Sequence, residues 1–173
     1  VMRLFFVVGP SGAGKDTLLS GAIAADPALH WARRVITRPE SAGGEPFEGV
    51  TEAEFAMRLA RGDFALHWGA HGLRYGVPYT ELQQGRDVLL NGSRAAIPQA
   101  LAAFPDLRVI LITAPIAVLA DRLMGRGRET RDQIEARLSR VSEPLPAGVP
   151  VIEISNDALP ETGVARLLQA LRG

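Results

Sequence analysis

The chain has 173 residues and a formal net charge of zero, with 47% hydrophobic and 22% charged residues and no cysteine. This length fits one globular domain, the balanced charge argues against a general nucleic-acid binder, and the lack of cysteine excludes disulfides, thiolate metal sites and thiol catalysis. No apolar run approaches the roughly 20 residues of a membrane span, and the start lacks a signal-peptide pattern, so we expect a cytoplasmic protein with no membrane partner.

Strands and helices are predicted to alternate along the chain. Residues 4–8 form a continuous apolar run, which is typical of a parallel strand buried on both faces. After Gly9, apolar positions at helical spacing predict a helix over 16–25. Further strands are predicted at 33–37, 87–90, 107–113 and 151–155, and further helices at 94–104, 116–126 and 161–171. This alternation predicts parallel βαβ units, and therefore an α/β fold.

Two stretches interrupt the alternation. One, at about 38–80, is rich in Gly and Pro and then shows the capping-box pattern Thr51-x-x-Glu54, which predicts a short helix within a small insertion. The other, at about 125–140, is a Gly-Arg-Gly-Arg turn before a helix that Thr130 is expected to cap, and we interpret it as a mobile lid. A single domain is expected, with its core at 1–37 and 86–173.

The segment from 9 to 17 carries the strongest chemical signal. It matches the G-x-x-x-x-G-K core of a P-loop, between a predicted strand and a predicted helix. In such a loop the backbone N–H groups and the helix N-terminus face phosphate oxygens, and the lysine, here Lys15, reaches the β- and γ-phosphates. Lys15 is the one lysine among 19 Lys and Arg residues. The predicted ATP-binding residues are Gly9, Pro10, Ser11, Gly12, Ala13, Gly14, Lys15, Asp16 and Thr17.

Asp16 stands where the motif normally has Ser or Thr, whose hydroxyl binds Mg²⁺. A carboxylate is also a suitable oxygen ligand for this hard cation, so we predict that Asp16 binds Mg²⁺ directly or through water. Two alternatives stay open. Thr17 could be the ligand, or the helix dipole alone could favour an acidic residue at position 16.

Six segments, in this order, resemble the guanylate-kinase-like family. They are GPSGAGKD, VITRPESAGGE, FALHWGAHGLRYGVP, LLNGSRA, RGRETRDQIEARLSRV and ISND, and together they extend over nearly the whole chain. The resemblance implies a P-loop fold of the nucleoside-monophosphate-kinase type. That fold has a five-stranded parallel core, an acceptor-binding insertion at about 38–80 and a lid at about 125–140.

The resemblance also implies what the acceptor is not. Arg38 and Tyr75 match family positions that hold the acceptor's phosphate, whereas His67 and Asn91 stand where the family binds guanine with acidic residues. When the polar partners of a bound base are missing, the preference for that base falls by a factor of roughly 10⁴ or more. GMP is therefore not the expected acceptor. The variant pattern is similar to the ribose 1,5-bisphosphate phosphokinases of phosphonate breakdown. Their product is 5-phosphoribosyl 1-diphosphate.

An acceptor with two phosphates and no base requires planar, permanently charged donors. The candidate substrate-binding residues are Arg34, Arg38, Arg74, Tyr75, Ser93 and Arg94. His67 and His71 flank the expected acceptor pocket, either as donors to phosphate and sugar or as packing residues.

The resemblance implies in-line transfer from ATP to the acceptor's 1-phosphate, without a covalent enzyme intermediate. Catalysis then consists of positioning and of charge neutralisation by Lys15, Mg²⁺ and arginines of the lid. The resemblance assigns phosphate clamping to Arg122, Arg126 and Arg137, with Arg128 and Arg140 as weaker candidates, and places Asn156 and Asp157 beside adenine.

Other functions stay open. A guanylate kinase, or a kinase of another small phosphorylated metabolite, would share the P-loop and the lid. A binding module without catalysis would tolerate a ruined P-loop, which this chain does not have. We expect small-molecule substrates and no nucleic-acid partner, and we leave a homodimer open.

Overall fold

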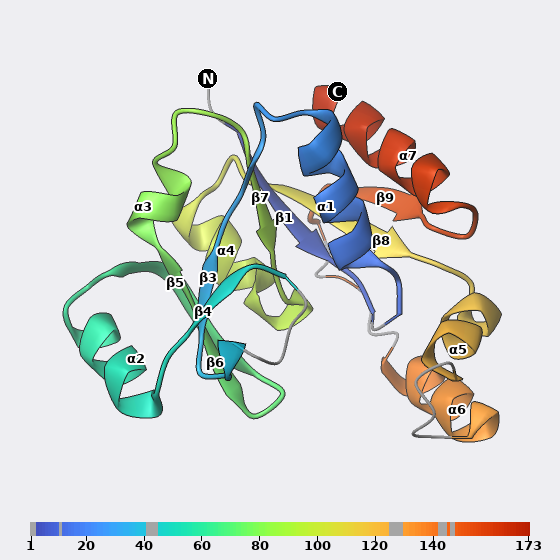
Figure 1. The fold of residues 1–173 in the computed structure, drawn as a ribbon, viewed down its shortest axis with the longest axis horizontal. Helices are drawn as coiled ribbons and strands as arrows, with labels where there is room; N and C mark the ends of the chain where they lie inside the picture. The colour runs from blue at the N-terminus through green and yellow to red at the C-terminus, as the bar shows by residue number, and fades with distance from the viewer. Residues whose placement is uncertain (1–2, 11, 41–44, 125–129, 142–144, 146–147) are drawn as a thin grey trace.

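A computed structural model of the protein describes residues 3–10, 12–40, 45–124, 130–141, 145 and 148–173, with the backbone alone for 137–141. It contains a five-stranded sheet of order β2-β7-β1-β8-β9 and a four-stranded sheet of order β4-β3-β6-β5 (Figure 1). Every neighbouring pair in the five-stranded sheet is parallel. The predicted α/β fold with a parallel five-stranded core is confirmed.

The five-stranded sheet is built from segments before and after the insertion. Its strands are β1 (Leu4–Val8), β2 (His30–Trp31), β7 (Val88–Asn91), β8 (Arg108–Thr113) and β9 (Val151–Ser155). The helices around it are α1 (Lys15–Ala25), α3 (Tyr79–Leu82), the 3₁₀ turn η2 (Arg94–Ala96), α4 (Ile97–Ala103), α5 (Ile116–Met124), α6 (Arg131–Val141) and α7 (Pro160–Arg172). In the described part of the chain, no helix has both the length and the apolar character that a membrane span requires.

The side chains of β1 alternate between two buried layers. Phe5 and Val7 pack with residues of α1, α5, α6 and α7, whereas Phe6 and Val8 pack with residues of α3 and α4. Because both faces of the strand are covered, its sequence is a continuous apolar run. β1 lies between β7 and β8, so the loop that follows it opens at the carboxyl edge of the sheet, where open α/β folds bind ligands.

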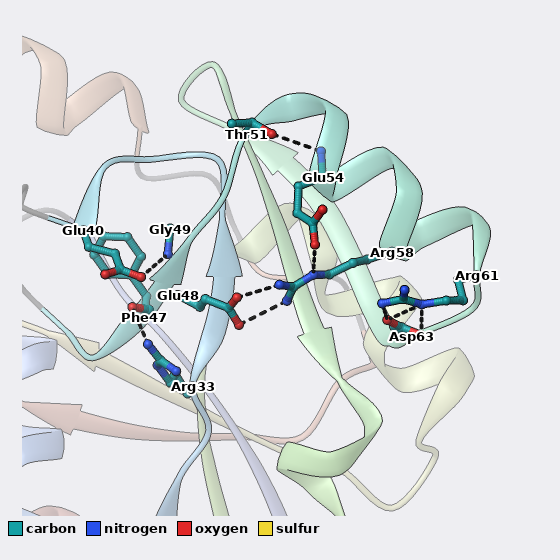
Figure 2. Close-up of polar contacts among 10 residues, drawn as sticks. All are labelled: Arg33, Glu40, Phe47, Glu48, Gly49, Thr51, Glu54, Arg58, Arg61 and Asp63. Carbon is teal, nitrogen blue, oxygen red and sulfur yellow. Dashed lines mark hydrogen bonds and ion pairs between the residues drawn. The ribbon is translucent and has the colours of Figure 1, made fainter.

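The insertion is a small sheet with one helix. Its strands are β3 (Arg34–Ile36), β4 (Phe47–Gly49), β5 (Phe64–Ala70) and β6 (Leu73–Pro78), and its helix is α2 (Glu52–Ala60). The predicted helix start is confirmed, since the Thr51 hydroxyl accepts the N–H of Glu54 at 3.1 Å. Figure 2 shows how Arg58 joins α2 to β4. Its guanidinium donates to Glu54 within the helix at 2.9 Å and to Glu48 on β4 at 2.6 Å.

The insertion begins earlier than the sequence suggested. The strand expected at 33–37 is β3, which pairs with β4 and β6 rather than with the parallel sheet, and the parallel sheet has β2 at its edge instead. An apolar sequence predicts that a strand is buried, but it does not predict which strand will be its neighbour. The two sheets share buried side chains, since Leu66 and Val77 pack with Phe6.

Candidate active site

The P-loop follows β1 and opens α1, as predicted. Gly12 and Gly14 have φ angles of 84° and 86°, in the left-handed region that glycine adopts without strain. The Ala13 N–H donates to the Pro10 carbonyl at 3.2 Å, which closes the turn, and the Leu18 N–H donates to the Gly14 carbonyl at 3.0 Å. The loop therefore curls around the N-terminus of α1, the arrangement that binds phosphate.

Arg122 and Asn156 hold the outer side of this loop. The Arg122 guanidinium donates to the carbonyls of Gly12 at 3.0 Å and of Asn156 at 2.6 Å. The Asn156 amide donates to the Ala13 carbonyl at 2.7 Å. Because a trans peptide points its C=O and N–H in opposite directions, the N–H of Gly14 faces away from Asn156. Both predicted residues thus contact the P-loop backbone, and Asn156 is buried beneath it.

A pocket of about 560 Å³ lies against the P-loop. Its lining from the loop consists of Gly9, Pro10, Gly12, Gly14, Lys15, Asp16 and Thr17. Three further lining residues come from elsewhere in the chain: His71 from the insertion, Asn91 from the end of β7, and Arg122 from α5. The pocket therefore joins the predicted nucleotide site to the insertion.

Lys15 lies in a cationic environment. Burial is the largest cause that lowers its pKa, to about 8, and the charges of Arg34 and Arg94 lower it further while Asp16 acts in the opposite direction. Burial also lowers the pKa of Arg34, to about 10, which leaves this guanidinium charged at neutral pH. Several positive charges held close together destabilise one another, and a bound polyanion such as a phosphorylated substrate relieves that repulsion.

Asn91 links the P-loop to the insertion. Its side-chain amide donates to the Asp16 carboxylate at 3.3 Å and to the Glu45 carboxylate at 3.2 Å. Glu45 also accepts two hydrogen bonds from Arg34, which lies on β3. An amide with two N–H donors fits between two carboxylates, where a third carboxylate would repel both.

Arg34 lies in an aromatic slot of the insertion. The rings of Trp68 and Tyr75 stack with their centroids 5.7 Å apart, and the Arg34 guanidinium carbon lies 4.8 Å from the Tyr75 centroid. The Arg38 guanidinium carbon lies 5.3 Å from the centroid of Phe47. The structure therefore brings the predicted residues Arg34 and Tyr75 together, in contact with the network that reaches Asp16.

Two predicted contacts come from the end of β7. Ser93 and Arg94 follow Asn91 after one intervening residue, Gly92, and both are half-buried. The charge of Arg94 lowers the pKa of Lys15, which puts this guanidinium within electrostatic reach of the P-loop. Their assignment to substrate binding stays a prediction.

Two predicted residues are engaged elsewhere. Arg74 lies 4.7 Å from the Phe55 ring and 3.9 Å from Glu52, both on α2, and strand alternation puts it on the face of β6 opposite Tyr75. Asp157 is exposed and pairs with Arg166 at 3.1 Å, which lowers the pKa of its carboxyl group. Their assignment to acceptor and adenine binding stays a prediction.

Part of the predicted site lies outside the described residues. This holds for Ser11, Arg126 and Arg128, and the side chains of Arg137 and Arg140 in α6 are likewise not described. Sequence reasoning missed Glu45 as a site residue. Its segment belongs to the family resemblance, but nothing in the sequence indicated that its carboxylate is 8% exposed and bound to Arg34.

Comparison with known proteins identifies relatives over nearly the whole chain, although no family model matches it. A ribose 1,5-bisphosphate phosphokinase PhnN from Thiobacillus denitrificans is 45% identical over 175 residues, which cover 98% of this chain and 92% of that protein. One from Ruegeria sp. is 53% identical over 154 residues, which cover 87% of this chain and 81% of that protein. The chain belongs to the ribose 1,5-bisphosphate phosphokinase family.

Some relatives of this phosphokinase family are much longer. A bifunctional ribose 1,5-bisphosphokinase-thymidine phosphorylase from Cupriavidus necator is 53% identical over 172 residues, which are 97% of this chain and 29% of that protein. The chain thus spans less than a third of the length of this bifunctional relative.

The fold of this chain is similar to that of solved kinases. A guanylate kinase from Anaplasma phagocytophilum superposes with a TM-score of 0.69 at 19% identity, over 99% of this chain and 84% of that one. A sugar kinase from Janibacter sp. superposes with a TM-score of 0.58 at 17% identity, over 99% of this chain and 95% of that one. Identities this low support the fold alone.

Proposed function

We propose that the protein transfers the γ-phosphoryl group of ATP to the 1-phosphate of ribose 1,5-bisphosphate, giving 5-phospho-α-D-ribose 1-diphosphate and ADP. The observation that carries this acceptor is 45–53% identity, over most of the chain, to proteins that are named for it. The cationic pocket beside the P-loop supports it, because ATP and a bisphosphate bring many negative charges to one place.

The P-loop is proposed to hold ATP. The N–H of Gly14 and the Lys15 ammonium bind phosphate oxygens, and Arg122 and Asn156 keep the loop in shape from behind. Asp16 is the proposed Mg²⁺ residue, since its exposed carboxylate lines the pocket, and Mg²⁺ would supply neutralisation of the phosphate charge. Among the described residues no three acidic or histidine side chains form a metal cluster, and Mg²⁺ in kinases needs only one or two carboxylates.

The insertion is proposed to hold the acceptor. Arg34 lies on β3, Arg38 just after it, and Tyr75 on β6. Arg34 is connected to Asn91, which lines the pocket, through the Glu45 carboxylate. An oxygen of the 1-phosphate attacks the γ-phosphorus, the bond between that phosphorus and the β,γ-bridging oxygen breaks, and ADP leaves. The attacking oxygen is already anionic at neutral pH, so no general base is required. The remaining catalytic task is electrostatic, and Lys15 and the arginines serve it.

The proposal is tested by ADP release from Mg-ATP with ribose 1,5-bisphosphate, with GMP and without acceptor, followed by mass identification of the product. Turnover with the bisphosphate alone, and a product with the mass of 5-phosphoribosyl 1-diphosphate, is the expected result. The Lys15→Ala variant serves as the control for contaminating kinases and should be inactive. Faster turnover with GMP would refute the proposed acceptor. We further propose that the enzyme acts on small molecules in the cytoplasm, where ATP is available.

A further inference from the structure

His71 lies at the tip of the hairpin formed by β5 and β6. Ala70 and Leu73 are the last paired residues, so the turn consists of His71 and Gly72 alone. Their φ angles are 53° and 73°, and positive φ at both central residues is the requirement of a type I′ turn. Among the described residues, His71 is the one non-glycine residue with positive φ.

Histidine adopts positive φ more often than most residues, but it is not among the residues that dominate this turn. The first position of a type I′ turn favours Asn, Asp or Gly, which tolerate the left-handed region with little strain. Non-glycine residues with positive φ occur disproportionately at sites of function. The sequence places an imidazole where an asparagine would stabilise the turn better, so the imidazole itself needs an explanation.

The position of His71 supplies one. It lines the same pocket as Lys15 and Asp16, although it comes from the insertion. The two other lining residues from outside the P-loop already have partners in the protein, since Asn91 donates to two carboxylates and Arg122 donates to backbone carbonyls. No hydrogen bond or ion pair joins the His71 imidazole to any residue that the structure describes. Within the described part of the chain, His71 is thus a donor without a partner, and it lines the pocket where the proposed reaction brings two phosphates together.

We propose that His71 is a phosphate-binding residue for the acceptor, whose imidazole N–H donates to an oxygen of the attacking 1-phosphate. The inference rests on the proposed function. The P-loop already surrounds the phosphates of ATP with backbone donors and Lys15, whereas His71 belongs to the insertion that carries Arg34 and Tyr75. Two anions approach each other during transfer, and a donor aimed at the attacking phosphate offsets their repulsion. His71 would move no proton.

The decisive variant is His71→Asn. Asn-Gly is a preferred type I′ pair, so the hairpin and the melting temperature should be preserved or improved. Loss of one hydrogen bond to a charged group should reduce kcat/KM for ribose 1,5-bisphosphate roughly tenfold or more, mostly through KM, with KM for ATP unchanged. An unchanged kcat/KM for the acceptor, or an increase confined to KM for ATP, would overturn the proposal.

His67→Asn is the matched control, because His67, which the sequence also left open as a donor, does not line the pocket that His71 lines. His67 is exposed on β5 of the same hairpin, and strand alternation places it with Gly69 and Arg74 on the face toward α2, opposite Trp68 and Tyr75. The same substitution there should leave both KM values and kcat unchanged. If both variants lose acceptor affinity equally, the effect belongs to the hairpin and not to His71, and the proposal fails.

A binding measurement separates this inference from the proposed reaction. The chain has three histidines, so the imidazole resonances can be assigned with the two variants. Addition of ribose 1,5-bisphosphate without ATP should shift the His71 resonances and leave those of His67 in place. If wild-type protein fails to turn over the bisphosphate but the His71 resonances still shift, the proposed reaction fails and the phosphate contact stands. If turnover occurs but the His71 resonances do not shift, even at saturation with the bisphosphate, the His71 contact is refuted and the proposed reaction stands.

Discussion

The Glu45 carboxylate accepts two hydrogen bonds from the Arg34 guanidinium, one from Nε at 3.0 Å and one from Nη2. Both residues are buried, at 8% and 7% exposed. Breaking a buried pair by removing one partner is strongly destabilising, because the remaining charge is left without compensation. This pair also occupies the Nε and one Nη2 donor of Arg34, so only the remaining N–H groups of the guanidinium are left for an anionic acceptor.

We therefore expect Glu45→Gln to lower the free energy of unfolding by about 3–5 kcal/mol, measured by urea denaturation. The matched control is Glu48→Gln, which breaks the more exposed pair with Arg58 and should cost less than about 1 kcal/mol. Replacing both partners, in Arg34→Met with Glu45→Leu, should cost less than the single change. Equal losses of unfolding free energy in the two variants would contradict the idea that Glu45→Gln leaves the buried Arg34 charge without a partner.

The bridge made by Asn91 leads to a second prediction. Asn91→Asp replaces a double donor with a third carboxylate between Asp16 and Glu45, so kcat/KM should fall at least about tenfold at pH 8. Asn91→Ser, which adds no charge, should be impaired less. The difference between the two variants should narrow at acid pH, where the new carboxyl group is protonated. Identical pH profiles would mean that charge at this position is unimportant.

Much of the fold was predictable because its signals are local. The P-loop is a contiguous motif, the start of α2 follows from the Thr51 cap, and the buried run of β1 needs no knowledge of its neighbours. The pairing of β3 with β4 and β6 was not predictable, because strand partners are set by contacts distant in sequence. The edge strand β2 has only two residues, which is too short for a periodic pattern.

The candidate site was predictable where motif and family resemblance point to the same residue. Lys15 and Asp16 line the pocket, and Arg34 and Tyr75 lie together. Glu45 escaped prediction because the burial of a carboxylate depends on a partner from another strand. Arg122 was predicted from the resemblance as a phosphate clamp, but its hydrogen bonds to the P-loop carbonyls depend on tertiary packing that the sequence does not reveal.

The pKa of Lys15 gives a prediction about pH. Burial, and then the charge of Arg34, lower this pKa to about 8 in the free protein, so the ammonium is lost as the pH rises through 8. Phosphate binding needs the charged form. We expect kcat/KM for Mg-ATP to fall above pH 8 by up to about tenfold per pH unit, since this parameter reports groups of the free enzyme.

Proton linkage provides the check. ATP binding stabilises the ammonium, so calorimetry at pH 9 in buffers of different ionisation enthalpy should show proton uptake, which Lys15→Met abolishes. The unfolded chain holds this proton up to about its ordinary pKa of 10.5. Between pH 8 and 10.5 the unfolded state binds more protons, so Lys15 makes the ligand-free protein more stable as the pH rises. Stability that falls over this range in wild type relative to Lys15→Met would contradict the lowered pKa.

Gly14 and Gly85 separate two costs of replacing a glycine. Both have positive φ, 86° and 69°, but a Cβ at Gly14 would lie 2.6 Å from the Asn156 amide nitrogen, whereas a Cβ at Gly85 would have no atom within 4 Å. Gly85→Ala should therefore lose about 1–2 kcal/mol of unfolding free energy, the cost of a left-handed backbone at a non-glycine residue, and keep its activity. Gly14→Ala should lose more, because Asn156 must move from the Ala13 carbonyl and the P-loop loses its shape. The affinity for ATP, measured by calorimetry, should fall in Gly14→Ala alone. Equal affinity in the two variants would show that the contact between Asn156 and the loop does not maintain the phosphate site.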